Sequence, residues 1–227
     1  MIGVGGATET EWVQGQANLA RESGRFGFGI LLWSLANRPE LFDALLELEP
    51  FALCLSFGDP TRYVDRAHSA GVRVIAQVQD AELATRALSA NVDAIVAQGT
   101  EAGGHTGSVG TLPLVQKVLG LAAGTGIPVI AGGGIATGHA IAGLLAMGCE
   151  GVWVGTRFVA STESITASEG KAAVVRAKET ETVLTHVFDI VQGADWPAEL
   201  PGRALSNDFT RAWHGQEEAL EKGLEDA

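Results

Sequence analysis

The stretch "PVIAGGGIATG", residues 128–138, decides between the folds that this sequence allows. It runs from a short apolar segment, the pattern of a buried strand, through three glycines into a helical pattern. Thr137, a residue type favoured at helix N-caps, stands just before that helix. The next unit, "VWVGTRF" at 152–158, repeats the strand and the glycine turn. Glycine turns after the last two strands are typical of a (β/α)8 barrel, which commonly binds a phosphate there.

The same alternation of short apolar runs and helical patterns extends back to residue 1. Within the runs, apolar residues occupy consecutive positions, as in parallel strands covered on both faces. An open doubly wound sheet would also fit, but neither "GVGGAT" nor "GFGILL" has the G-x-G-x-x-G spacing of a dinucleotide-binding sheet. We therefore predict an α/β barrel, with strands at 1–4, 26–32, 51–56, 73–77, 92–97, 128–131 and 151–154 and helices at 9–23, 39–48, 63–70, 81–90, 113–121 and 139–147.

The rhythm of strands and helices stops after Phe158. We expect residues 1–160 to form the barrel domain and residues 161–227 to form a C-terminal extension packed on it, because the extension has too few apolar residues for a core of its own. Helices are predicted in this extension at about 171–178 and over 208–227.

Composition excludes several classes of protein. The net charge of −12 is spread along the chain, which argues against nucleic acid or an anionic membrane surface as a partner. No apolar run reaches the roughly 20 residues of a membrane span, and no signal peptide is recognisable, so we expect a cytoplasmic protein. Cys54 and Cys149 lie in or beside apolar runs without metal or disulfide spacing and are predicted to be buried thiols.

Two neighbouring strand ends carry candidates for a phosphate site. The backbone N–H groups of Gly133, Gly134 and Gly155 and the hydroxyl of Thr156 could share one phosphate group, aided by the positive end of a helix. The alternative is that the glycines only form tight turns and that Arg157 pairs with a carboxylate.

A histidine in a glycine-rich loop is the candidate catalytic residue. In "VAQGTEAGGHTG", residues 96–107, Gln98 lies at the C-terminal end of a predicted strand, and His105 lies in the loop that follows. Gly103 and its glycine neighbours leave room for a flat ligand beside the imidazole. Gln77 ends the preceding strand and could bind a ligand edge bearing carbonyl and N–H groups. The alternatives are a histidine that caps a backbone carbonyl and an ordinary surface glutamine.

The remaining histidines do not indicate a metal site. His68, His139, His186 and His214 form no set with cysteines or carboxylates at ligand spacing, so we predict that no metal is bound.

Three motifs in the same order, "AQGTEAGGHTG", "IPVIAGGGIATG" and "EGVWVGTRFVAS", resemble the nitronate monooxygenase family of FMN-dependent (β/α)8 barrels. The resemblance implies that His105 lies near the reactive edge of the flavin, as a catalytic base or an electrostatic aid. It places Gln77, Gln98 and Gly103 against the flavin ring. The FMN phosphate would then bind at the turns that contain Gly133, Gly134, Gly155 and Thr156.

The resemblance also implies a reaction. An enzyme of this type oxidises small alkyl nitronates or nitroalkanes with O2 to carbonyl compounds and consumes no NAD(P)H. Two alternatives stay open: an NAD(P)H-dependent FMN enoyl-thioester or quinone reductase of the same superfamily, and a truncated barrel without catalytic activity.

Two positions depart from the family pattern. Relatives have a strand, loop and helix before a segment like residues 1–6, so we expect a barrel without its first βα unit. The edges of strands 1–4 and 151–154 would then be unpaired unless a tail segment or a second copy covers them, which makes a homo-oligomer one expected state. Gly29 replaces an asparagine found in many relatives, so one expected flavin hydrogen bond is missing.

Overall fold

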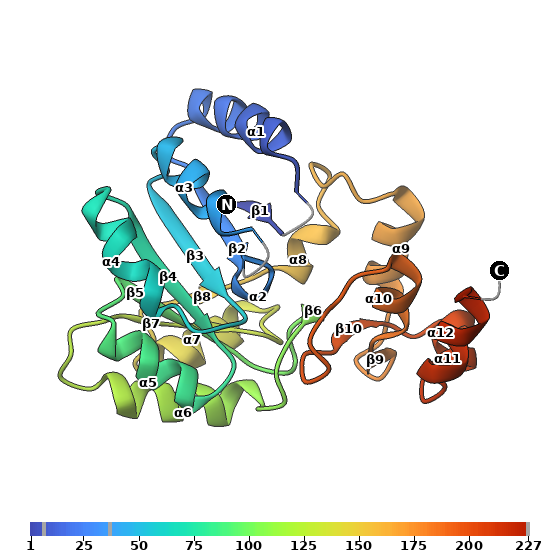
Figure 1. Ribbon diagram of the computed structural model, residues 1–227. Coiled ribbons are helices and arrows are strands. Elements are labelled where there is room, and N and C mark those ends of the chain that lie inside the picture. The colour runs from blue at the N-terminus through green and yellow to red at the C-terminus, as the bar shows by residue number, and fades with distance from the viewer. Residues whose placement is uncertain (6–7, 36–37, 226–227) are drawn as a thin grey trace.

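A parallel seven-stranded sheet forms the centre of the protein in a computed structural model that describes residues 1–5, 8–35 and 38–225 (Figure 1). Its order is β1-β2-β3-β4-β5-β7-β8, and all pairs are parallel. All seven predicted strands are thereby confirmed. The bounds are β1 Ile2–Val4, β2 Gly27–Leu31, β3 Ala52–Ser56, β4 Arg73–Val78, β5 Ala94–Gln98, β7 Val129–Gly132 and β8 Gly151–Trp153.

The strand order confirms the barrel type of α/β fold. Each strand lies beside the one before it in the sheet, whereas in a doubly wound sheet the order reverses at a switch point. Among the described residues, β1 and β8 pair on one side only, so they form the two edges of the sheet, as expected from seven strands.

Helices cover the outer face of the sheet. Alternate strand residues such as Phe28, Leu53 and Ile95 are fully buried against them in the main core. The residues between these, such as Cys54 and Ser56, point to the inner face. The bounds are α1 Thr10–Glu22, α2 Leu32–Leu35, α3 Pro39–Glu47, α4 Thr61–Ser69, α5 Ala81–Ser89, α6 Thr111–Ala122, α7 Gly138–Ala146 and α8 Thr156–Val159.

Local capping fixes where two of these helices begin. The Thr137 side chain accepts a hydrogen bond from the Ala140 N–H at the start of α7, which confirms the predicted N-cap. Asp80 caps α5 in the same way, through the Leu83 N–H. Both caps lie at the C-terminal ends of strands, and they hold the turns from strand to helix in place.

The C-terminal extension lies beside the C-terminal ends of the strands (orange to red in Figure 1). Its β10 pairs with both β9 and the short β6 of the histidine loop in a second, antiparallel sheet. The extension therefore reaches the loop that carries His105. The bounds are β6 Gly104–His105, α9 Ser168–Arg176, β9 Thr182–Thr185, α10 Val187–Gln192, β10 Gly202–Leu205, α11 Asp208–Trp213 and α12 Glu217–Glu225. The prediction of one helix over 208–227 was wrong, because the chain turns between α11 and α12, where Gly215 has φ +82°.

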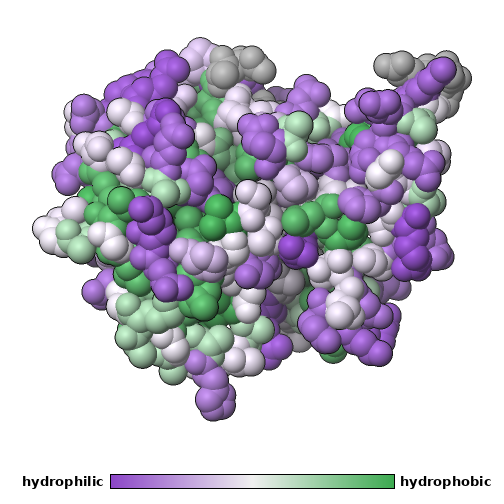
Figure 2. Space-filling model, turned by 90° about the horizontal axis from the view of Figure 1, so that it is seen from below, coloured by the Kyte–Doolittle hydropathy of each residue, from purple (hydrophilic) through white to green (hydrophobic). Residues whose placement is uncertain are grey.

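The surface mixes apolar and polar residues. On the face shown in Figure 2, hydrophobic residues gather in patches on both the sheet side and the extension side, and hydrophilic residues separate the patches. Within the described ranges, no helix is long and apolar enough to cross a lipid bilayer.

Both cysteines are buried and free, as predicted. Burial raises the pKa of the Cys54 thiol to about 11 and also raises the pKa of Cys149. The two thiols are therefore protonated and unreactive near neutral pH.

Candidate active site

The C-terminal ends of β5, β7 and β8 lie side by side and bring the predicted residues together. In the sheet register Gln98 is level with Gly132, and Gly132 is level with Trp153. The glycine turn at 133–134 and the turn at 155–156 follow directly after these positions. The two strand ends expected to share an anion are thus neighbours.

Close backbone approach explains two of the glycines. A Cβ on Gly103 would overlap the Thr156 hydroxyl oxygen, so these two predicted residues are in contact. Gly133 has φ +105°, and a Cβ there would lie 2.9 Å from the Gly99 carbonyl oxygen. A Cβ on Gly155, by contrast, would meet no heavy atom within 4 Å. The first two glycines are needed by the fold itself, whereas the space at Gly155 is open.

Glu101 supports the glycine turn. Its carboxylate accepts hydrogen bonds from the Thr111 N–H at 2.7 Å and from the Thr111 hydroxyl at 2.8 Å, at the start of α6. The Thr111 oxygen is also 3.1 Å from the Gly133 carbonyl oxygen. Burial raises the pKa of Glu101, but the hydrogen bonds from Thr111 and the charge of Arg203 outweigh it, so the pKa is below its ordinary value.

A chain of amide groups leads from the sheet to the histidine loop. Gln79 Nε2 donates to Gln98 Oε1 at 2.9 Å, and Gln98 Nε2 donates to the His105 carbonyl oxygen at 3.2 Å. Because a backbone carbonyl can only accept, this chain fixes the orientation of both amides. Gln79 Oε1 is left buried without a hydrogen-bond partner among the described residues, as is the Trp33 indole N–H.

The sequence singled out Gln77 but missed Gln79. Gln77 is level with Ser56 and Val96 in the sheet, and Gln79, whose side chain joins the amide chain, directly follows the last residue of β4. Its side chain makes no hydrogen bond to another described residue. The available signal was the alternation of side chains in a strand, which turns Gln77 and Gln79 to the same face.

His105 is held by the extension rather than by the barrel. Its Nε2 is 3.0 Å from Asp189 Oδ1 on α10, and its ring stacks on Trp196 with 3.4 Å between ring centroids and 4° between planes. The imidazole is 19% exposed and the carboxylate 12%. The alternative of a histidine that caps a backbone carbonyl does not describe this ring, because the ring is hydrogen-bonded to a carboxylate.

Asp189 contacts a second histidine that the sequence had set aside. His186 Nδ1 is 3.1 Å from Asp189 Oδ2, and its Nε2 is 3.1 Å from the Ala198 carbonyl oxygen. The signal in the sequence was a lone aspartate inside the apolar run "LTHVFDIV", three residues after a histidine. Buried carboxylates are rare unless they are paired.

A cavity of about 640 Å³ opens between the strand ends and the extension. Trp33 and Phe57 line it and also flank Trp196, the ring that stacks on His105. Gln79 and residues 107–109, just beyond His105, form another wall, and residues 197, 199 and 200 of the extension close it. Gln79, which carries the orphan amide oxygen, lines the cavity, whereas His105 and the glycine turns are not among its described lining residues. The volume suits an organic molecule larger than a few atoms.

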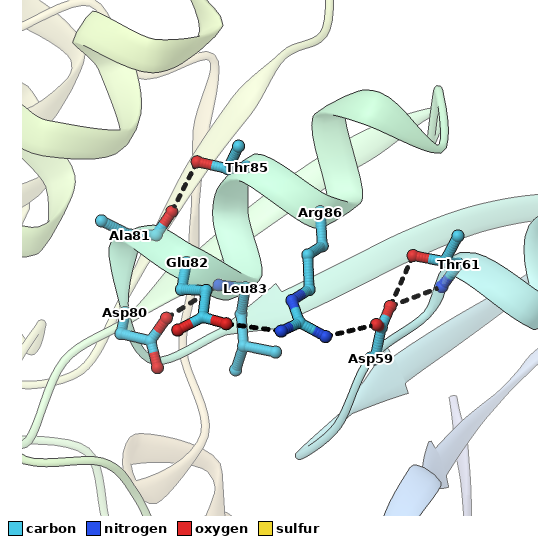
Figure 3. Close-up of polar contacts among 8 residues, drawn as sticks. All are labelled: Asp59, Thr61, Asp80, Ala81, Glu82, Leu83, Thr85 and Arg86. Atoms are coloured by element: carbon cyan, nitrogen blue, oxygen red, sulfur yellow. Dashed lines mark hydrogen bonds and ion pairs between the residues drawn. The ribbon is translucent and has the colours of Figure 1, made fainter.

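Charged side chains at the rim of the cavity neutralise one another (Figure 3). Arg86 lies between Asp59 and Glu82 and donates to both carboxylates. Burial raises the pKa of Asp59, but hydrogen bonds from Thr61 and Arg86 together lower it by more than burial raises it, so the pKa is below its ordinary value. Arg86 is thus committed to structural ion pairs and is not a free cation for an anionic substrate.

Comparisons with known proteins show what this chain is similar to. A family model described as nitronate monooxygenase matches residues 41–221. The probable nitronate monooxygenase of Staphylococcus aureus strain Newman is 32% identical over 190 residues, which cover 74% of this chain and 53% of the relative. The chain thus spans about half the length of the curated relatives it matches.

Two solved structures are also similar. FabK from Thermotoga maritima has a TM-score of 0.81 at 32% identity, over 96% of this chain and 68% of that chain. Nitroalkane oxidase from Streptomyces ansochromogenes has a TM-score of 0.76 at 26% identity, over 93% and 70%.

Proposed function

This chain belongs to the nitronate monooxygenase family, and we propose that it is an FMN-dependent oxidoreductase that oxidises alkyl nitronates or nitroalkanes with O2 to carbonyl compounds. The observation that carries the proposal is the arrangement at the strand ends: glycine turns on two adjacent strands, a buried amide oxygen without a partner among the described residues, and an imidazole stacked on a tryptophan that contacts two residues of the cavity wall.

The residues present fit FMN. Gly133, Gly134, Gly155 and Thr156 would bind its phosphate, because they follow adjacent strands and the space at Gly155 is open. The orphan Oε1 of Gln79 supplies the acceptor that an N–H group of a flavin ring needs. A buried acceptor without a partner is costly, and a bound ligand that donates to it removes the cost.

Three further residues are proposed to contact the ring. Gln98 continues the amide chain from Gln79, and Gly103 would contact the ring through its backbone, because the Thr156 hydroxyl fills the space that a side chain would take. Gln77 lies deeper on the same inner face. Gly29 has no side chain and so offers no side-chain hydrogen bond there, and the space beside its Cα is open.

Bound FMN would supply the redox chemistry between substrate and O2. His105 does the proton chemistry: a nitroalkane must lose a carbon-bound proton, and an imidazole is a suitable base near neutral pH. Its Nε2 is engaged by Asp189, so Nδ1 is the nitrogen that takes the proton. The adjoining cavity would hold the carbon skeleton of the substrate between Trp33, Phe57 and the extension.

Anaerobic mixing tests the proposal. Addition of an alkyl nitronate to the flavin-loaded protein should bleach the visible flavin spectrum, addition of NADH should not, and O2 should then restore the colour. Bleaching by NADH alone would instead establish the second candidate, an NAD(P)H-dependent enoyl-thioester or quinone reductase. The similarity to FabK, with a higher TM-score than that to nitroalkane oxidase, keeps that candidate in the test.

The visible spectrum itself tests the third candidate. Protein that stays colourless and gains no protein-bound flavin spectrum with added FMN is a barrel without catalytic activity. The orphan Gln79 oxygen favours a bound ligand, because no described residue donates a hydrogen bond to it.

A further inference from the structure

We propose that Asp189 is a positioning residue: it keeps the proton of the His105 imidazole on Nε2, so that Nδ1 is the nitrogen available to substrate, and His186 supplies its counter-charge. The inference rests on the proposed role of His105 as a base. It adds two residues of the extension, Asp189 and His186, to that role. Asp189 lies 84 positions after His105 in the chain.

The contact between Asp189 and His105 fixes the tautomer. An ionised carboxylate has no proton to donate, so a 3.0 Å contact with Nε2 requires the proton on that nitrogen. A neutral imidazole has one N–H, and its other nitrogen, Nδ1, is then an acceptor. Nδ1 has no hydrogen-bond partner among the described residues. The carboxylate therefore decides which nitrogen is the base.

The contacts of His186 identify the counter-charge. Both of its nitrogens face acceptors: Nδ1 faces the Asp189 carboxylate, and Nε2 faces the Ala198 carbonyl oxygen. Both hydrogen bonds form only if both nitrogens carry protons, which makes the ring an imidazolium. A buried carboxylate is costly without a compensating charge, and His186 provides it. His105 can then stay neutral while it donates to the same carboxylate.

The face of the ring is fixed as well as its edge. Trp196 stacks on His105 almost parallel to it, and a Cβ on Gly202 of β10 would lie 3.4 Å from Nε2. A half-turn of the imidazole would place the carbon Cε1 where Nε2 now faces Asp189 and would lose that hydrogen bond, so the stacked ring is held in the orientation that the carboxylate requires. Hydrogen bonding from a carboxylate to the far nitrogen commonly sets the tautomer of functional histidines.

Two substitutions separate position from charge. Asp189→Ala removes the acceptor. Asp189→Asn keeps an acceptor for His105. In that variant His186 still donates from Nε2 to the Ala198 carbonyl oxygen, and its Nδ1, now without a proton, accepts from the asparagine N–H. The asparagine oxygen is then left facing His105. Asp93 provides a matched control, because it accepts from His68 Nε2 at 2.9 Å on another part of the fold.

The experiment combines imidazole 15N NMR of the full chain with steady-state kinetics. The sequence holds five histidines, and His105 is assigned from the spectrum of His105→Gln. We expect Nε2–H at His105 in the parent and in Asp189→Asn, and a mixture of tautomers in Asp189→Ala. The kcat for a nitroalkane should fall by about 10- to 100-fold in Asp189→Ala and by much less in Asp189→Asn. Asp93→Ala should change neither readout.

Several results would overturn the inference. These are an Nδ1–H tautomer in the parent, an unchanged tautomer in Asp189→Ala, or a kcat in Asp189→Asn as low as in Asp189→Ala although Nε2–H is kept. The NMR result stands without turnover, so a parent protein inactive toward nitro compounds contradicts the proposed function alone. If Asp189→Ala does not fold, Asp189→Asn and the parent spectrum still decide the question.

Discussion

The protein contains two histidine–aspartate pairs of nearly the same length that lie in different surroundings. His68 on α4 contacts Asp93, the residue before β5, at 2.9 Å, and both side chains are about one-third exposed. His105 contacts Asp189 at 3.0 Å, and both side chains are largely buried. The first pair lies at the N-terminal ends of the strands and the second at the C-terminal ends. In barrels of this type, the former end serves stability and the latter serves catalysis.

The partners of the two aspartates show the same division. Asp93 also accepts from the Val74 N–H at 2.7 Å, so it joins helix α4 to two strands. Asp189 also accepts from a second histidine, so its partners are both titratable rings. Distance alone therefore does not identify a functional histidine; its place in the fold and the other contacts of its partner do.

The largest difference between the two pairs is expected in turnover. His105→Ala should lower kcat for a nitroalkane by about 100-fold or more, the usual contribution of a general base, and should keep FMN bound. His68→Ala should leave kcat unchanged. The test measures kcat by steady-state kinetics and the amount of bound FMN from the visible spectrum, for both variants and the parent. Equal activity in the parent and in His105→Ala would remove the distinction between the pairs.

The second-largest effect is expected in flavin affinity, which should depend on the turns at the C-terminal ends of the strands. Gly155→Val should weaken FMN binding by about tenfold, roughly 1.4 kcal/mol, because the side chain would occupy the open space proposed for the phosphate. Titration of the apoprotein with FMN measures the effect, and the melting temperature controls for folding. Normal flavin affinity in this variant would contradict the phosphate assignment.

Loss of the Glu101 carboxylate, which supports the glycine turn through Thr111, should have a smaller effect, and that effect is on stability. Glu101→Gln weakens the charge-assisted bonds to Thr111 and should lower the free energy of unfolding by about 1 kcal/mol at pH 7. The pKa of Glu101 is lowered in the fold, so its contribution is present above pH 4.5 and is lost as the pH falls through the folded pKa. Denaturant unfolding at neutral and acidic pH should show the gap between parent and variant closing in acid.

The smallest effect is expected at the exposed pair. Burial raises the pKa of Asp93, but hydrogen bonds from the Val74 N–H and His68 together lower it by more, so the pKa is below its ordinary value of 3.8. Its stabilisation is therefore present above that pH and is lost in more acidic solution. Asp93→Asn should cost less than about 1 kcal/mol because the pair is partly exposed. A larger loss in urea unfolding, or any loss of turnover, would show that this pair is more than a surface contact.

Much of the fold follows from local sequence patterns. The seven strands and their helices were predictable because the apolar pattern of each one lies within a single continuous stretch of sequence. The turn after residue 131 was predictable because glycine readily adopts a positive φ such as the +105° of Gly133. The glycine turns, Gln98 and His105 were predictable for the same reason, since each lies at or just after a strand end.

The partners of His105 could not be predicted in this way. Asp189 and Trp196 come from the extension, whose segments are short, irregular and without a repeating period, so no local pattern states which loop they touch. Gln79 was missed because its role depends on an amide chain that only the assembled sheet reveals. Contacts between distant segments are set by packing, which a single sequence does not display.

The small antiparallel sheet has a consequence for how the site is assembled over time. Arg203 on β10 donates to the Thr100 carbonyl oxygen across 103 residues, and β10 pairs with the strand that carries His105. A ribosome must therefore synthesise the chain as far as β10 before the histidine loop can reach its final place, although the central strands are made much earlier. Contacts of such high sequence separation form late and open early. Mild denaturant or a protease that cleaves the extension should therefore abolish activity while the central sheet is still folded.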